Sequence, residues 1–358
     1  MSDFLRTVKR VVVTGAAGSV GRHLVAHLLE ATQAEVVGLD SNESVLYYLE
    51  DRWRSEPRMK FYISDIRQLE NLEDHFKGAD VVFHGAALKH LPLCERSPFE
   101  AVRTNIHGVQ NVIRAATAAR VSRVLYMSTD KAASPTTVMG TSKLMGERLI
   151  TAAQASSGDS HSTVFATTRF GNVAGSTGSV IPLFVRQIER RGPVTITDPD
   201  MTRFIMTADQ AVALMIESIN LAHGGEVFVT KMPVVRIIDL ARVMIGLLAP
   251  LHRYDPKAID LQHVGPRPGE KLHEDLVTAE EAHRTHELDH LFVIRPALDQ
   301  TSSGASLSCP TLAQRSLKNE YRSDLYAPMS HAELASFLEQ PGVLPDELRE
   351  RLIQTDAA

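Results

Sequence analysis

A strand, a glycine-rich turn and a helix follow one another near the start of the chain. Residues 11–14 form a β-branched run of the kind that is buried on both faces of a parallel sheet. Three glycines follow at a spacing of three residues, and a helical segment extends from residue 19 to about residue 31. Glycine allows a tight turn, and the first N–H groups of a helix bind phosphate oxygens, so this arrangement predicts a dinucleotide site. Its predicted contacts are Gly15, Ala17, Gly18, Ser19, Val20 and Gly21.

Short apolar runs alternate with helical segments through the next 140 or so residues. The predicted strands cover residues 35–40, 59–65, 79–86, 122–128 and 163–170, and the predicted helices cover 41–54, 67–76 and 98–119. Such alternation places parallel strands in one sheet with helices on both faces. We therefore predict an α/β fold with a doubly wound parallel (Rossmann) sheet.

The pattern becomes less regular in the second half of the chain. Short strands are predicted at 194–197, 204–206 and 227–229, with helices at 207–221 and 237–248. We expect residues 1–175 to form mainly the dinucleotide-binding domain, with later segments interleaved. Residues 176–298 are expected to form mainly a smaller α/β substrate-binding domain. Residues 299–358 are predicted to hold a linker at 301–312 and a helical tail with a last helix at 330–338.

Charge and hydropathy exclude two classes of partner. The formal net charge of −5 gives no sign of the basic stripe that nucleic-acid-binding proteins carry. No apolar run approaches the roughly 20 residues that span a bilayer, and the stretch before the first strand is too short for a signal peptide. We therefore expect no nucleic-acid partner, no membrane insertion and a cytoplasmic location.

The cysteines and the spaced histidine pairs do not indicate a metal site. Cys94 and Cys309 lie far apart and form neither a disulfide pattern nor a metal-ligand pattern. Two histidine pairs have the one-turn spacing of a helix face, but both lack the glutamate of a zinc-protease motif and a third ligand. These pairs are His23 with His27 and His286 with His290. We predict no metal.

Two acidic residues at strand ends are predicted to bind the nucleoside half of the dinucleotide. Asp40 ends the second strand 19 residues after Gly21. A carboxylate there accepts hydrogen bonds from the adenosine ribose and repels a 2′-phosphate, and no arginine stands beside it, so NAD is favoured over NADP. Asp65 and Ile66 are predicted to meet the adenine; the alternative for Asp65 is an ordinary turn or cap residue.

Several strings of residues resemble a known family. The glycine spacing and HGAA at 84–87 resemble the extended short-chain dehydrogenase/reductase superfamily, which implies that Ala86 and Ala87 contact the cofactor. More specific strings are ALKHLPLCE at 87–95, TNIHG at 104–108, STDK at 128–131, VMGTSK at 138–143, RFGNV at 169–173, DPDMTRF at 198–204 and RPGEKL at 267–272. They resemble the bacterial UDP-N-acetylglucosamine 4,6-dehydratases of surface-polysaccharide and flagellin-sugar pathways, over roughly residues 8 to 296.

Met139 departs from the pattern of most soluble members of this family. They have a tyrosine four residues before the helix lysine, which is Lys143 here, whereas large membrane-anchored members often have methionine. The DSNE string at 40–43 also resembles the large type. The chain is therefore similar to the catalytic half of a large member without its membrane region.

The resemblance implies a reaction without net redox change. A hydride passes from sugar C4 to NAD⁺, a base removes the C5 proton while water leaves from C6, and the hydride returns to C6. By the same resemblance, Asp130 donates to the leaving hydroxyl and Lys131 takes the C5 proton. Thr129 bonds the C4 oxygen, and Lys143 binds the nicotinamide ribose.

The acceptor of the C4 hydroxyl proton stays open, because methionine cannot ionise. The candidates are Lys131, Lys143 acting through a ribose hydroxyl or a water, and His90; Lys131 or a lysine–water relay is favoured. Met139 is expected to pack against the sugar or the nicotinamide. Lys89 and His90 are expected to border the nicotinamide and hexose.

The resemblance also implies a UDP-sugar site and a homo-oligomer. Asn172 would contact the diphosphate or sugar, Arg203 and Arg267 would clamp the diphosphate, and Glu270 would accept from the ribose. A dimer through the helices that carry Asn105 and Lys143 is expected, with higher oligomers open. The rival activities are a UDP-sugar 5,6-dehydratase, a C4 epimerase, and a cofactor-binding protein without catalytic activity.

Overall fold

The computed structural model describes residues 3–156, 163–297 and 315–356. Its contacts divide the chain into two compact units. The first, called the sheet unit here, comprises Met1–Phe170, Val212–Lys231 and Val277–Glu320. The second unit comprises Gly171–Ala211, Met232–Leu276 and Tyr321–Ala358. The interleaving is deeper than the sequence indicated, while the predicted linker at 301–312 lies outside the described residues.

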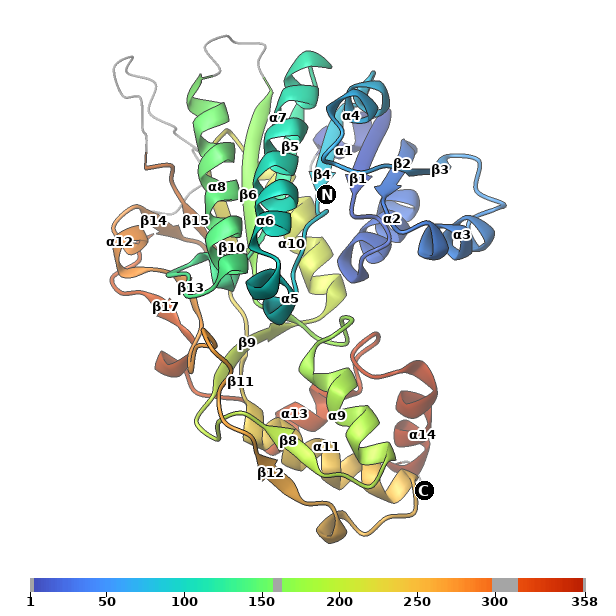
Figure 1. Cartoon of the computed structure of the whole chain (residues 1–358), viewed down its shortest axis with the longest axis vertical. Helices are drawn as coiled ribbons and strands as arrows, with labels where there is room; N and C mark the ends of the chain where they lie inside the picture. Colours follow the sequence, from blue (N-terminus) through green and yellow to red (C-terminus); the bar gives the residue numbers. More distant parts are fainter. Residues whose placement is uncertain (1–2, 157–162, 298–314, 357–358) are drawn as a thin grey trace. The chain divides into compact units, whose positions relative to one another are not determined.

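A ten-stranded sheet forms the centre of the sheet unit (Figure 1). Its order is β16-β14-β15-β10-β6-β5-β4-β1-β2-β3, and all the pairs from β10 to β3 are parallel. These parallel strands are β1 (Arg10–Thr14), β2 (Glu35–Asp40), β3 (Met59–Ile63), β4 (Val81–His84), β5 (Arg123–Thr129), β6 (Val164–Phe170) and β10 (Val227–Thr230). The predicted doubly wound parallel sheet is confirmed.

Three further strands extend this sheet in the antiparallel sense, which the sequence did not predict. They are β15 (Leu291–Ile294), which pairs with β10, then β14 (Thr285–Glu287) and β16 (Arg315–Ser316). The predicted strand at 227–229 belongs to this sheet rather than to a substrate-binding domain, since Val227 and Phe228 pair with β6. Short strands carry no signal of their distant partners, so the pattern alone did not assign them.

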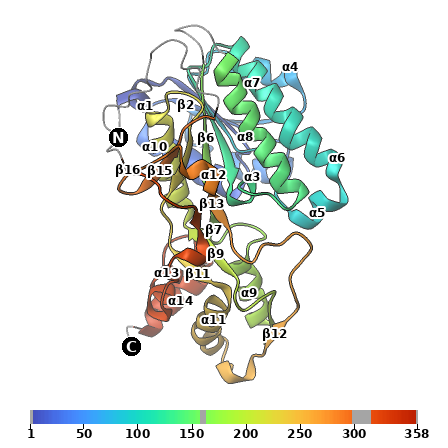
Figure 2. The ribbon, with the colours of Figure 1, turned by 90° about the vertical axis from the view of Figure 1, so that its left-hand side faces the viewer.

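Helices cover both faces of the sheet. Figure 2 shows α4, α7 and α8 together over one face and α10 on the other. The helices of this unit are α1 (Asp3–Thr7), α2 (Ser19–Ala31), α3 (Glu43–Arg52), α4 (Leu69–Phe76), α5 (Leu91–Arg96), α6 (Pro98–Ala101), α7 (Gly108–Ala118), α8 (Val138–Ser156), most of α10 (Ala208–Leu221) and α12 (Ala279–Ala282). Apolar side chains of β1, β4 and β5 pack against those of α7, which explains the unbroken β-branched runs.

The helix predicted at 98–119 is interrupted by a π-helical turn. Val102–His107 forms this turn between α6 and α7. A π-helical turn inserts an extra residue into the helical register and is frequent at functional sites. It leaves the apolar periodicity of α7 intact, so it was not visible in the pattern.

The second unit has its own apolar core. The core lies among α9 (Val180–Glu189), α11 (Ile237–Leu251), α13 (His331–Leu338), α14 (Asp346–Asp356) and β8 (Val194–Ile196). The other strands of the unit are β7 (Asn172–Val173), β9 (Thr202–Met206), β11 (Val234–Arg236), β12 (Leu261–His263), β13 (Asp275–Val277) and β17 (Tyr321–Arg322). The last predicted helix is present as α13, and Ser330 and Glu333 form a capping box at its start. The C-terminal helices are thus part of this core rather than an appended tail.

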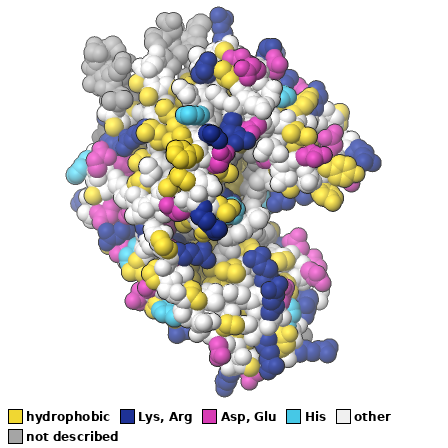
Figure 3. Space-filling model, viewed as in Figure 1, with side chains coloured by type: hydrophobic (Ala, Val, Ile, Leu, Met, Phe, Trp, Pro, Cys, Tyr) yellow, Lys and Arg dark blue, Asp and Glu magenta, His cyan; other side chains and the backbone are white. Residues whose placement is uncertain are grey.

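The surface carries charges of both signs. Figure 3 shows an apolar patch over α3, where Tyr47 and Tyr48 are exposed. Exposed basic residues also occur at the end of α9 and just after it, at Arg186, Arg190 and Arg191. Among the described residues, no helix is long and apolar enough to cross a membrane.

The packing of α13 gives a test of the second unit. Phe337 is 4% exposed in its core, so Phe337→Ala should lower the free energy of unfolding by about 3–5 kcal/mol. Ile353→Ala on α14 is the control, because Ile353 is 45% exposed and its loss should cost about 0.5 kcal/mol or less. Urea unfolding followed by circular dichroism measures both. Equal stability of the two variants would show that α13 is not part of the core.

Candidate active site

The glycine-rich turn connects β1 to α2 and leaves no room for a side chain at Gly15 or Gly21. Gly15 has a φ of 75°, and a Cβ there would lie 2.6 Å from the backbone nitrogen of Ala86. A Cβ on Gly21 would lie 2.2 Å from the carbonyl oxygen of Gly15. Gly18 is the N-cap of α2 and gives no side-chain capping bond, and no acidic residue stands in the first turn. The start of α2 therefore has the shape and the polarity to receive an anionic phosphate.

Asp40 is held at this turn by two backbone N–H groups, and its contact with a ribose stays a prediction. One carboxylate oxygen accepts from the N–H of Ala17 at 3.0 Å, and the other accepts from the N–H of Asn42 at 3.0 Å. An ionised carboxylate has about four acceptor positions, so both oxygens can also accept from a ribose. The residues that would select NAD thus fit a dinucleotide without a 2′-phosphate.

Asp65 and Ile66 have other partners in the structure. The guanidinium of Arg67 holds the carboxylate of Asp65, with its Nε 2.8 Å from one oxygen, and this hydrogen bond lowers the pKa of Asp65. Ile66 is buried and contacts Gly108 at the start of α7. These contacts favour the structural interpretation of Asp65 that the sequence left open, and contact with adenine stays a prediction.

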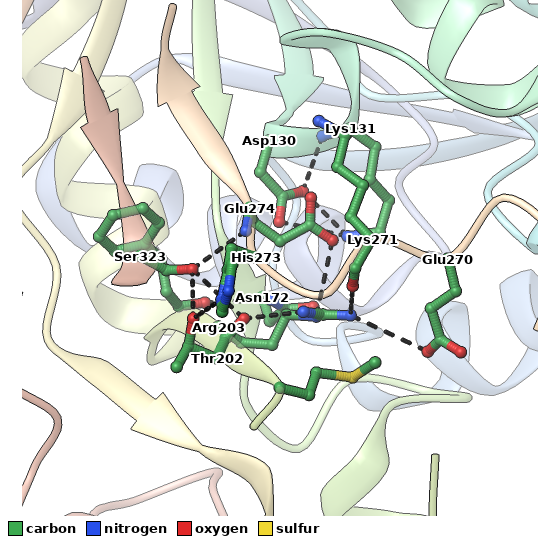
Figure 4. A network of polar contacts seen from close by, with 12 residues as sticks. Asp130, Lys131, Asn172, Thr202, Arg203, Glu270, Lys271, His273, Glu274 and Ser323 are labelled. Atoms are coloured by element: carbon green, nitrogen blue, oxygen red, sulfur yellow. Dashed lines mark hydrogen bonds and ion pairs between the residues drawn. The ribbon is translucent and has the colours of Figure 1, made fainter. Parts of the chain in front are cut away.

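Thr129, Asp130 and Lys131 form one hydrogen-bonded group at the carboxyl end of β5. Lys131 Nζ lies 3.0 and 3.2 Å from the two carboxylate oxygens of Asp130, and Figure 4 shows its side chain turned toward them. Thr129 Oγ1 donates to Asp130 at 2.6 Å, and the Lys131 N–H donates to the same oxygen at 3.0 Å. The side chain of Asp130 is 1% exposed and that of Lys131 is 24% exposed. A buried acid and a reachable amine are therefore in direct contact.

Lys143 lies in α8 against the same strand. Its Nζ donates to the carbonyl of Met127 at 2.5 Å and stands 4.3 Å from the ring centroid of Tyr126. Burial lowers the pKa of Lys143 to about 7, and the negative charge of Glu147 opposes this shift. A lysine in this state can exchange a proton near neutral pH.

Met139 stands one turn before Lys143 and is buried. Its side chain packs in a small apolar cluster with Cys94 and Ala101. Contact of Met139 with a sugar or nicotinamide stays a prediction. The same helix is anchored through Asn105 in the π-helical turn, which donates to Ser142 Oγ at 2.9 Å and bonds both backbone groups of Leu88.

Lys89 and His90 follow β4 and are both exposed. The carbonyl of His90 caps α5 by accepting from the N–H groups of Leu93 and Cys94. Their predicted positions beside the nicotinamide and hexose remain untested predictions. Buried His84 does have a partner, since its Nδ1 lies 2.7 Å from Thr14 Oγ1.

Sequence reasoning missed a buried ion network in the sheet unit. The guanidinium of Arg169 on β6 lies between two carboxylates, at 2.7 Å from Glu147 on α8 and at 2.9 Å from Glu281 on α12. The side chains of the three residues are 0%, 4% and 6% exposed. A charged residue within the apolar strand at 163–170 was the available signal, because buried charges need partners.

Arg203, in the second unit, was predicted to clamp a diphosphate, but its guanidinium already has partners. It donates to the carbonyls of Thr202, Lys271 and Leu272 at 2.7 to 3.0 Å and lies 3.5 Å from Glu274 (Figure 4). These contacts fix the RPGEKL segment against β9. Such a structural role was not visible in the sequence, and contact with a diphosphate stays a prediction.

The other predicted substrate residues also lie in the second unit. Asn172 donates to the carbonyl of Phe204 at 3.1 Å. Arg267 and Glu270 close a tight turn, in which the Glu270 N–H donates to the carbonyl of Arg267 and the carboxylate accepts from the Arg267 N–H. The residue Arg267 is exposed, and its guanidinium forms no ion pair within the described part of the chain. Of the two predicted clamps, Arg267 is thus the exposed one, and its contact with a diphosphate stays a prediction.

Only one of the two histidine pairs lies on a helix. His23 and His27 do lie on α2, but His286 lies in β14 and His290 follows that strand, so the helix predicted for this second pair is wrong. Within residues 3–156, 163–297 and 315–356, no group of three or more His, Cys, Asp or Glu could hold a metal ion.

Comparisons with known proteins identify the family. A family model described as "Polysaccharide biosynthesis protein" matches residues 11–296. An uncharacterized membrane protein of Methanocaldococcus jannaschii is 46% identical over 83% of this chain and 88% of its own. A UDP-glucose 4-epimerase of Rickettsia bellii is 38% identical over 80% and 82%. A UDP-N-acetylglucosamine 4,6-dehydratase (inverting) of Campylobacter jejuni is 34% identical over 87% and 90%.

Solved structures share the fold. The crystal structure of Pen from Bacillus thuringiensis superposes with a TM-score of 0.87 at 38% identity, over 94% of this chain and 98% of that one. The dTDP-glucose 4,6-dehydratase DesIV from Streptomyces venezuelae, solved with NAD, has a TM-score of 0.65 at 24% identity, over 74% and 86%. The chain belongs to the polysaccharide biosynthesis protein family of extended short-chain dehydrogenases/reductases.

Proposed function

We propose that this protein is an NAD-dependent 4,6-dehydratase of a UDP-N-acetylhexosamine, UDP-N-acetylglucosamine in the first instance. The observation that carries the proposal is the direct contact of Asp130 with Lys131 at the carboxyl end of β5. In open α/β sheets ligands bind at this end of the strands. The dehydratase from Campylobacter jejuni, at 34% identity, supports the same reaction.

The cofactor site supports NAD. The turn around Gly15 admits no Cβ, α2 begins without a capping side chain, and Asp40 is fixed beside both. Once bound, NAD would supply the hydride chemistry by removing hydride from sugar C4 and returning it to C6. Everything else in the reaction is proton transfer by the protein.

Asp130 and Lys131 would supply the elimination. In the structure they form an ion pair, and transfer of one proton from Nζ to the carboxylate converts the pair into a neutral amine and a carboxylic acid. The amine of Lys131 then removes the C5 proton, while the acid protonates the leaving C6 hydroxyl. The elimination returns the ion pair. When the hydride returns to C6, the ammonium of Lys131 would give a proton back to C5, and the proton taken from the C4 hydroxyl would restore the one that the pair then lacks.

Lys143 is the proposed acceptor of the C4 hydroxyl proton, through a water. Its pKa of about 7 allows it to accept a proton at neutral pH. Lys131 is engaged with Asp130, and the exposed imidazole of His90 is the alternative acceptor. This assignment gives α8 the acid–base function that Met139 cannot provide.

The proposed contacts of UDP are residues that the resemblance singles out. Arg267 offers an exposed guanidinium for the diphosphate, with Asn172 and Glu270 as further polar contacts. Arg203 orders the segment that carries Arg267 and is the second candidate clamp. A cytoplasmic location and a homo-oligomer remain predictions from the sequence.

A C4 epimerase is the second candidate, because the Rickettsia bellii relative has that name. An epimerase must move the C4 proton in both directions without losing water. The buried carboxyl of Asp130 in contact with an amine suits elimination instead. The two activities give products of different mass.

Incubation with UDP-N-acetylglucosamine in D₂O tests the proposal. We expect a product lighter by one water, with a methyl group at C6 and deuterium at C5, by mass spectrometry and NMR. A C4 epimer of unchanged mass would sink the dehydratase assignment. No turnover of UDP-, dTDP- or GDP-sugars would favour a binding protein without catalytic activity.

Lys131→Ala should lower the rate of elimination by about 10²–10⁴-fold, because the C5 base is lost. Lys77→Ala is the matched control, since Lys77 is exposed and pairs with Asp74 on the surface. Rates are measured by product formation at saturating substrate. Unchanged activity in Lys131→Ala would remove Lys131 from the mechanism.

Gly21→Ala should weaken NAD binding by about tenfold or more, because the new Cβ meets the Gly15 carbonyl and opens the turn. Gly246→Ala is the control, since among the described residues its added Cβ would meet no atom within 4 Å apart from the backbone of its own helix and its chain neighbours. Calorimetric titration with NAD compares the two variants with the parent protein. Equal affinity in all three would refute the role of this turn.

A further inference from the structure

The Glu147–Arg169–Glu281 network is not used in the reaction proposed above. Arg169 Nε and Nη2 lie 3.1 and 2.7 Å from the two carboxylate oxygens of Glu147. Its Nη1 and Nη2 lie 2.9 and 3.0 Å from those of Glu281. Both pairs are two-pronged and buried, which makes the geometry specific. Burying three charges is costly, and an apolar core of similar volume is often as stable, so stability alone explains the network poorly.

The charges of the network leave one negative charge beside Lys143. Two carboxylates and one guanidinium sum to −1, and Glu147 stands one helical turn after Lys143 on the same face of α8. Protonated Lys143 would neutralise the set. At the far end, Glu281 is fixed by the capping box with Thr278, and Arg284 lies 3.8 Å away and pairs with Glu280 at the surface.

The elements packed against α8 carry other charged or titratable groups, and the charge of each bears on Lys143. Tyr126 on β5 keeps its proton, because burial raises its pKa well above the usual value. His84 on β4 is neutral, because burial lowers its pKa to about 3. The charges of Asp130 and Lys131 cancel, because the two side chains form an ion pair. Further charged or titratable side chains lie on α5, α6, the π-helical turn and α7: Glu95, Arg96, Glu100, Arg103, His107 and Arg114. Glu147 is the only carboxylate of α8 on its buried face.

We propose that the network is a positioning element for Lys143, in which Arg169 and Glu281 hold Glu147 so that its negative charge sets the proton affinity of the lysine. Burial alone would favour the neutral amine of Lys143, whereas the negative charge of Glu147 favours the protonated form. The positive charge of Arg169 partly offsets the negative charge of Glu147, and the negative charge of Glu281 partly offsets that of Arg169. The inference rests on the proposed function only in the catalytic use of Lys143, not in the charge of Lys143 itself.

The test measures the pKa of Lys143 directly in the protein as isolated. The ¹³Cε shift of Lys143 is followed against pH in protein labelled with ¹³C-lysine, and the signal is assigned by its loss in Lys143→Arg. Glu147→Gln should lower this pKa by about one unit or more, because a nearby negative charge is lost. Glu281→Gln should lower it in the same direction by a smaller amount.

Glu56→Gln is the matched control, since it removes a carboxylate whose partner is Arg58 in a turn before β3. The pKa of Lys143 should not move in this variant. A purely structural network would lower the melting temperature of Glu147→Gln and Glu281→Gln but leave the pKa of Lys143 unchanged, and that result would overturn the inference. If Glu147→Gln does not fold, the direction of the shift in Glu281→Gln decides.

The pH dependence of activity separates this inference from the proposed function. With neutral Lys143 as proton acceptor, kcat/KM rises with pH through its pKa, so Glu147→Gln should move this acidic limb to lower pH by the shift seen in the NMR titration. A shifted NMR titration with an unmoved activity limb would confirm the network and remove Lys143 as the acceptor. An unmoved NMR titration would reject the network whatever the activity shows.

Discussion

The parallel pairing of β1, β4 and β5 is the constraint on which the rest of the site depends. In this register Thr14 pairs with His84, and His84 pairs with Tyr126. The three strands therefore end at one edge of the sheet, where the glycine turn and the Thr129–Lys131 group begin. Because both faces of these strands are buried, a slip of register would exchange the side chains packed on the two faces and move the glycine turn away from the Thr129–Lys131 group.

Local sequence patterns were enough to predict much of the sheet unit. The glycine turn, Asp40 and the buried strands are each defined by residues close together in sequence, so periodicity and spacing were enough to predict them. The antiparallel pairing of β15 with β10 and the π-helical turn at Asn105 were not predictable in this way. Both depend on contacts that the chain makes only when folded, and neither changes the local apolar pattern.

The candidate site shows the same division. Adjacent residues such as Asp130 and Lys131 could be singled out from the sequence, but their mutual ion pair is a property of the fold. Arg203 and Arg267 were both predicted to clamp a diphosphate. In the fold, the guanidinium of Arg203 donates to three backbone carbonyls, whereas Arg267 is exposed. Arg169 stood unexplained within a strand, because its partners Glu147 and Glu281 come from helices 22 and 112 residues away.

The interleaving of the two units has a consequence for how the chain is made. The backbone passes from one unit to the other at residues 170/171, 211/212, 231/232, 276/277 and 320/321, so neither unit is a continuous segment. During synthesis, the free edge of β6 is covered only after β10 has been made, and that of β10 only after β15 has been made. Until then the nascent sheet exposes unpaired backbone groups and apolar side chains, the kind of surface that chaperones bind and that leads to aggregation. Synthesis of a partial chain would therefore yield neither half of the enzyme in a finished form.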